Sequence, residues 1–214
     1  DFNSIAIPKN FSPEDTQWAL QYITATTRSA DKLAGSPRWS LFKNENHCVI
    51  GVTCMVKDLI GDRYSTDNDD LTKDCQGRPL YIFVGYATKL NKRQYLSSVP
   101  PYLGRNLELF EPLYQHVCEI WHIKEYEKFD KLPLLTNDGE LAYSDFQSNV
   151  NYDPLLAQQL NHSHKDCEGI FLGQDSDEYR KKLWATAAKC RFPISMCLGF
   201  RNESDALASP FVNG

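Results

Sequence analysis

The sequence predicts an α+β fold, in which a mainly antiparallel N-terminal sheet packs on a helix and a C-terminal β-α-β unit follows. Three observations indicate this class. Two uncharged runs rich in β-branched and aromatic residues, 48–56 and 80–87, have the composition of strands covered on both faces. Apolar residues at helical spacing follow in 113–121. Near the C-terminus, an apolar run, a helical stripe and a second apolar run succeed one another.

The elements before the first uncharged run are short. Residues 1–15 have the Pro, Asn and Ser content of an irregular arm. The next segment is ambiguous, because Ser12-Pro13-Glu14-Asp15 is a good helix start, whereas the β-branched residues of 22–27 favour a strand. We expect a strand over about 18–28. A second strand is expected at 38–42, followed by a hairpin turn at 44–46 that leads into 48–56.

The segment between the two uncharged runs, 58–74, contains six Asp residues and few large apolar ones. We therefore interpret it as a mobile surface loop. The ligand spacing of an EF-hand calcium loop is absent from it. The strand of 80–90 follows it. The first ninety residues therefore predict a mainly antiparallel sheet of three or four strands.

The middle of the chain changes from strand patterns to helix patterns. Leu113, Val117, Ile120 and Trp121 form an apolar stripe on a helix expected over 111–128. Residues 131–153 are expected to form a loop. Asp153 should cap a short helix over 154–162, which Pro154 starts.

The C-terminal β-α-β unit is expected to begin with a strand at 169–173 and to end with one at 193–200. Asp175 and Glu178 have the spacing of a capping box at the start of the helix between them. The two strands should then be parallel, with a right-handed crossover. The unit either extends the N-terminal sheet or forms a subdomain. We expect a single α+β domain over 1–214, with any subdomain boundary near 91–105.

Composition limits the classes of protein that fit. The chain has 214 residues, of which 42% are hydrophobic, so it can bury a large core. A net charge of −5 argues against a nucleic-acid partner, because a polyanion favours a basic face. No apolar run is long enough to span a membrane. The seven cysteines include no Cys-x-x-Cys pair, which indicates buried thiols and a reducing, cytoplasmic location; the alternative is a secreted protein.

The densest cluster of metal-capable side chains lies in 161–167. On an extended segment, His162 and His164 would lie on one side and could share an ion such as Zn²⁺ or Mn²⁺ with Asp166. The string is similar to the His-x-His-x-Asp-His motif of metallo-β-lactamase-type hydrolases in its first five positions. Cys167 stands where that family has its last His, so we do not assign the chain to it. The alternative is a solvated loop with ordinary histidines.

Arginines lie at the edges of the predicted strands, and some could converge at one end of the sheet. Guanidinium groups beside aromatic rings suit a nucleotide, a phosphate or an acidic peptide. We therefore predict a ligand-binding site that contains Arg38, Trp39, Arg78 and Tyr86. The alternative is that each arginine pairs with a carboxylate of the 58–74 segment.

No catalytic pattern stands out. A Gly-x-Ser-x-Gly motif is absent. Cys118 lies four residues before His122 on the expected helix, and we interpret it as a thiol in the core or at its boundary. The sequence favours a non-catalytic binding or regulatory module, without a cofactor, that recognises a protein or a small anionic ligand through its sheet edge and loops. The alternative is a metal-dependent hydrolase or nuclease that uses His162, His164 and Asp166.

Overall fold

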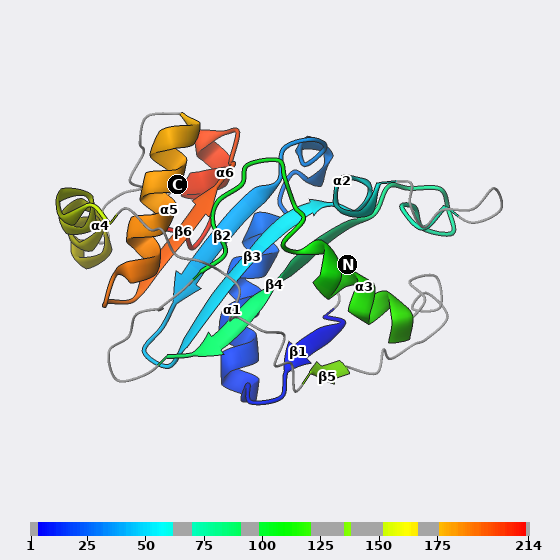
Figure 1. Cartoon of the computed structure of the whole chain (residues 1–214), viewed down its shortest axis with the longest axis horizontal. Helices are drawn as coiled ribbons and strands as arrows, with labels where there is room; N and C mark the ends of the chain where they lie inside the picture. Colours follow the sequence, from blue (N-terminus) through cyan, green and yellow to red (C-terminus); the bar gives the residue numbers. More distant parts are fainter. Residues whose placement is uncertain are drawn as a thin grey trace.

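Figure 1 shows the computed structural model of the chain, which describes residues 4–61, 70–90, 99–120, 135–137, 152–166 and 176–212. Within these ranges, the main sheet is antiparallel, with the strand order β4-β3-β2-β6. Its strands are β2 (Arg38–Lys43), β3 (His47–Met55), β4 (Tyr81–Lys89) and β6 (Ile194–Leu198). Helices and strands are mixed along the chain, so the predicted α+β class is confirmed.

Six helices lie in the same ranges: α1 (Pro13–Thr26), α2 (Val56–Ile60), α3 (Glu111–Ile120), α4 (Pro154–Asp166), α5 (Asp177–Lys189) and α6 (Glu203–Leu207). A 3₁₀ turn covers Ala30–Lys32. None of the helices in these ranges combines the length and the apolar composition that a membrane crossing requires.

The prediction of a strand over 18–28 is wrong, because this segment belongs to α1. The helix starts with a capping box: the Asp15 backbone N–H donates to the Ser12 hydroxyl at 3.1 Å, and the Ser12 N–H donates to the Asp15 carboxylate at 3.0 Å. Pro13 occupies the first turn. These start signals, together with packing of the helix on the sheet, outweigh the strand preference of the β-branched residues, which is a weak and context-dependent effect.

The hairpin predicted at 44–46 is confirmed. The Asn44 side-chain oxygen accepts from the backbone N–H groups of Asn46 and His47, at 2.8 and 2.7 Å. These hydrogen bonds stabilise the tight turn between β2 and β3. The first pair of the two strands after the turn is Lys43 with Cys48.

The two uncharged runs have different surroundings. β3 is central in the sheet, and all its residues except Met55 are buried, as predicted for a strand covered on both faces. β4 is an edge strand, and only Val84 in it is fully buried. The interior position predicted for 80–87 is therefore wrong. Composition did not separate the two positions, because half-buried edge strands also favour aromatic and β-branched residues.

The two faces of the sheet carry separate apolar clusters. On one face, α1 and the C-terminal segment pack on Phe42 and Val49. On the other, α5, α4, α2, α3 and the 99–110 segment pack on Trp39, Leu41 and Ile50. Figure 1 shows α1 crossing behind the sheet, with α3 and α5 on the near side. Successive residues of β2 therefore point into different clusters, as strand geometry requires.

The C-terminal unit is observed in part. α5 begins after Ser176, whose hydroxyl accepts from the Tyr179 N–H at 3.2 Å, so the cap lies one residue beyond the predicted Asp175. β6 follows and pairs antiparallel with β2, which extends the N-terminal sheet. The strand predicted at 169–173, and with it the expected parallel pairing, lies outside the described residues.

The middle segments differ from expectation in two places. Within the expected 131–153 loop, β5 (Leu135–Asn137) forms a short parallel pair with β1 (Ala6–Pro8) of the N-terminal arm. The predicted cap of α4 is confirmed, since Asp153 accepts from the backbone N–H groups of Leu155 and Leu156. The helix continues beyond 162 to Asp166. The part of the predicted 111–128 helix after Ile120 lies outside the described residues.

Candidate functional site

Two buried cations occupy the two ends of β2. Arg38 is 1% exposed and Lys43 is 4% exposed, although residues of these types are seldom fully buried. Their side chains point to opposite faces of the sheet, because they are an odd number of residues apart. Each donates hydrogen bonds to carbonyl groups at the C-terminus of a helix, where the helix dipole favours positive charge.

Arg38 holds the end of α1. Its Nη1 donates to the carbonyl of Thr26 at 2.7 Å and also to that of Arg28, and its guanidinium lies 5.1 Å from the centre of the Phe200 ring. Among the described residues, its Nε and Nη2 atoms have no hydrogen-bond partner, and neither has the Ser40 hydroxyl on the same face of β2. Burial lowers the pKa of Arg38, and nearby Asp205 and Asp31 partly oppose this effect.

Lys43 holds the end of α5. Its Nζ donates to the carbonyl of Ala188 at 3.3 Å and to that of Cys190. Burial lowers the pKa of this amine. Burial also raises the pKa of the Cys48 thiol to about 12 and that of Cys190 to about 11. Thiols with raised pKa values are poor nucleophiles, so this group has the properties of a structural clamp.

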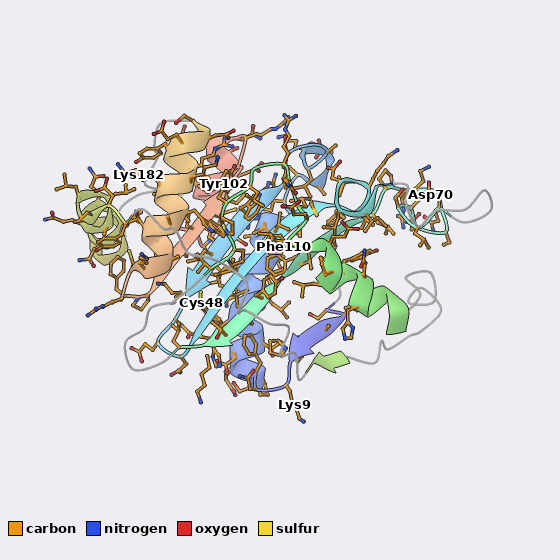
Figure 2. All side chains as sticks on the ribbon, viewed as in Figure 1. Lys9, Cys48, Asp70, Tyr102, Phe110 and Lys182 are labelled. Atoms are coloured by element: carbon orange, nitrogen blue, oxygen red, sulfur yellow. The ribbon has the colours of Figure 1, made fainter. Side chains whose placement is uncertain are left out.

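The predicted ligand-binding residues are not brought together. Trp39 is fully buried on the face opposite Arg38, and its indole N–H donates to the Gly104 carbonyl at 2.7 Å. It contacts the rings of Tyr102 and Phe110, which Figure 2 shows over the middle of the sheet. Its role in this arrangement is packing of the 99–110 segment.

The other two predicted residues lie elsewhere. Arg78 is exposed, and its Nε donates to the carboxylate of Asp74 at 2.6 Å, which is the carboxylate pairing considered as the alternative. Tyr86 is half-buried on β4, and its hydroxyl donates to the Leu109 carbonyl at 2.8 Å. Among the four predicted ligand-binding residues, Arg38 is the one whose buried N–H donors, Nε and Nη2, have no hydrogen-bond partner in the described part of the chain.

The predicted metal cluster lies on a helix rather than on an extended segment. The backbone of His162, His164 and Asp166 belongs to the last turns of α4. Residues two apart on a helix do not face each other, so the assumed arrangement of the two histidines does not hold. Their side chains lie outside the described residues, and in the described part of the chain no three His, Cys, Asp or Glu side chains form a group that could hold a metal ion.

One surface hollow lies on the α1 side of the molecule. It has a volume of about 590 Å³, lies between α1 and the C-terminal segment and is lined by Gln17, Gln21, Thr24 and Ser209 beside apolar groups. None of its lining residues is ionisable. It offers no group for catalysis and no charge to select a ligand.

The sequence predicted recognition through a sheet edge without identifying the strand, and the outer edge of β4 is one of the two edges of the main sheet. Just beyond the two ends of β4, backbone hydrogen bonds join Leu80 to Val56 and Leu90 to Asn46, in register with the β3–β4 pairing. In an antiparallel pair, alternate residues point their backbone groups to the partner strand. Ile82, Val84 and Tyr86 therefore bond to β3, whereas the N–H and C=O groups of the residues between them point outward.

The outward residues are Tyr81, Phe83, Gly85, Ala87 and Lys89. Tyr81 and Lys89, at the two ends, are exposed, and the three between them are partly exposed. In the described part of the chain, the outward backbone groups of Phe83, Gly85 and Ala87 have no hydrogen-bond partner. β4 contains no proline and no carboxylate, and Lys89 at its end is its one charged residue. Apart from Lys89 at its end, β4 therefore contains none of the residue types that usually block strand pairing.

The centre of β4 also comes unusually close to β3. Gly85 pairs directly with Gly51, and a Cβ atom on Gly85 would lie 2.5 Å from the Ile50 carbonyl oxygen. The Phe83 ring covers Gly51, since a Cβ atom there would lie 2.4 Å from it. An aromatic ring over a strand glycine restores packing that the glycine lacks, which supports the pairing of β4 with β3.

The chain matches no known family, no curated protein and no solved structure.

Proposed function

We propose that this protein is a non-catalytic binding module that recognises a partner protein by pairing an extended segment of that partner with the edge of β4. The observation that carries the proposal is the row of outward N–H and C=O groups at Phe83, Gly85 and Ala87. An unpaired edge of this length is a template for another strand, and natural proteins normally protect such edges. Strand addition at an exposed edge is a common mode of peptide recognition.

Two further features support strand addition. β4 pairs with β3 along its whole length, and β3 pairs in turn with β2. The β4 edge therefore needs little ordering when a partner binds. The half-buried side chains of β4 alternate between two apolar clusters, with Phe83 and Ala87 on the α1 face and Ile82 and Tyr86 on the other. These side chains offer apolar contacts to the side chains of an added strand on both faces of the sheet.

A library of immobilised nine-residue peptides with alternating β-branched residues tests this proposal without changing the protein. The peptides that bind are resynthesised with N-methyl groups on every second amide, in the two alternative sets. We expect one set to abolish binding and the other to leave it nearly unchanged, because only every second amide of an added strand faces β4. Equal effects of the two sets, or backbone NMR shifts remote from Phe83, Gly85 and Ala87, would contradict the proposal.

A second candidate function is the binding of a small carboxylate at Arg38. The specific observation is the buried Nε and Nη2 pair, which is the side of a guanidinium that donates two parallel hydrogen bonds to a carboxylate. Isothermal titration with formate measures it. We expect saturable binding that Arg38→Lys abolishes, since an ammonium lacks the planar fork. Absence of saturable heat from the unaltered protein would exclude this candidate.

The metal-dependent hydrolase that the sequence left as an alternative remains a separate prediction. Titration of the full chain with Zn²⁺ and Mn²⁺ tests it, with His164→Ala as the comparison variant. Stoichiometric binding lost in that variant would favour the hydrolase, and an unchanged melting temperature with EDTA would favour the binding module.

A further inference from the structure

The edge of β4 is complementary to itself. Its five outward residues are placed symmetrically about Gly85, the middle residue of the strand Tyr81–Lys89. If a second β4 lies antiparallel to the first, with Gly85 opposite Gly85, then Phe83 lies opposite Ala87 and Tyr81 opposite Lys89. In this register every outward N–H and C=O of one strand meets an outward group of the other.

Side-chain sizes agree with the same register. The large ring of Phe83 faces the methyl group of Ala87, and the two glycines at the centre allow the backbones to approach closely. On the other face of the sheet, the bulky Tyr86 lies opposite the smaller Val84. No two large rings and no two like charges are directly opposite each other anywhere along the paired strands.

Charge also favours self-pairing. Lys89, the one charged residue of β4, lies opposite the exposed ring of Tyr81, where an ammonium over an aromatic face is favourable. A shift of the register by two residues would remove the central glycine pair and leave outward groups unpaired at both ends. The strand thus specifies one antiparallel arrangement.

We propose that the partner recognised by the β4 edge is a second copy of this chain, which joins the two main sheets into one antiparallel sheet of eight strands, four from each copy. This inference rests on the proposed function and names its partner. The symmetry is two-fold, because each strand presents the same edge to the other. The backbone ladder provides the attraction, and the Gly85 pair fixes the register.

Sedimentation of the full chain from micromolar to sub-millimolar concentration tests the proposal. We expect a reversible change from 24.5 kDa to twice that mass. Tyr81→Lys should weaken dimerisation by about tenfold, because it places two lysines opposite each other at both ends of the paired strands. The double variant Tyr81→Lys with Lys89→Glu should restore dimerisation, since opposite charges then face each other. Leu155→Ser, at an exposed leucine of α4, is the control and should have no effect.

Both altered β4 residues are exposed, so the variants should fold, and their melting temperatures at low concentration check this. A chain that stays monomeric at every concentration would overturn the inference, as would a dimer that is insensitive to Tyr81→Lys. A synthetic peptide with the sequence of Tyr81–Lys89 separates the two proposals. We expect it to bind and to compete with dimerisation. If it fails to bind while library peptides still add to the edge, the second copy is excluded and the binding module stands.

Discussion

Arg38 and Lys43 show how a single buried charge can join a strand to a helix. Each side chain reaches carbonyl groups that α1 or α5 leaves without intrahelical partners. The positive charge also meets the negative end of the helix dipole. For Arg38, stacking on Phe200 adds contact area to the guanidinium. These contacts offset a desolvation cost that would otherwise exclude a cation from the core.

The first prediction concerns the Arg38 contacts. Arg38→Ala should lower the free energy of unfolding by about 3 kcal/mol, because it leaves helix carbonyls unpaired and opens a cavity beside Phe200. Arg38→Met should cost about 1 kcal/mol, since it keeps the volume and removes the buried charge. Urea unfolding measures both changes. Equal losses in the two variants would mean that volume has no part in the effect.

The second prediction concerns pH. The pKa of the buried Cys48 thiol is raised from 9.0 to about 12 and that of Cys190 to about 11. The folded state therefore keeps protons that the unfolded chain releases above pH 9. The free energy of unfolding should fall as pH rises from 9 towards 11, by up to about 1.4 kcal/mol per pH unit for each thiol. The lowered pKa of Lys43 acts in the opposite direction and reduces the slope.

Urea unfolding at several alkaline pH values measures this slope. Cys48→Ala should make it shallower, because one of the four buried thiols of the described residues, whose pKa values burial raises, is then absent. Cys75→Ala, at an exposed thiol, is the matched control and should leave the slope unchanged. A decline of the same steepness in all three proteins would show that other groups cause it.

Sequence patterns identified Arg38 as a candidate but not its surroundings. The carbonyl groups that it contacts belong to the end of α1, and the sequence predicted a strand there. The prediction grouped Arg38 and Trp39 at one end of the sheet, yet adjacent strand residues point to opposite faces. Which arginine is buried depends on the long-range pairing of β2 with β3 and β6, and no local pattern contains that information.

At the scale of elements, helix α1 depends on its capping box. Ser12→Ala should lower the free energy of unfolding by about 1 kcal/mol, because the Asp15 backbone N–H loses its partner. Gln17→Ala, at an exposed position of the same helix, should change it by less than about 0.5 kcal/mol. Thermal unfolding followed by circular dichroism compares the two. A loss at Gln17 as large as that at Ser12 would contradict a specific contribution of the cap.

Element type was predictable where local signals agreed and failed where they conflicted. The Asn44 turn, the Asp153 cap and β3 have consistent patterns, and the structure confirms them. In α1, cap residues and β-branched residues disagreed, and packing on the sheet decided the outcome. For β4, the sequence identified a strand but not its edge position, because that depends on which strand lies next to it.

At the scale of the whole molecule, the sheet combines both ends of the chain. β6 follows the predicted 91–105 boundary in sequence, yet it pairs with β2 from before the boundary along Trp39–Lys43. The C-terminal Phe211 lies against Tyr22 of α1 and Phe42 of β2. On the opposite face, the Trp184 indole of α5 donates to the Pro100 carbonyl at 2.8 Å. Segments distant in sequence thus share both apolar clusters.

These shared contacts predict that the chain unfolds as one cooperative unit. Two variants test this, each with a single tryptophan retained and the others changed to Phe: one reports on Trp18 at the α1 face, the other on Trp184 at the α5 face. Urea unfolding of each variant is followed by tryptophan fluorescence and by circular dichroism. In each variant, the two midpoints should coincide, because neither face keeps its packing once β2 separates from β6. A fluorescence midpoint displaced from the circular dichroism midpoint in either variant would instead show that the segment after 91–105 unfolds as a separate subdomain.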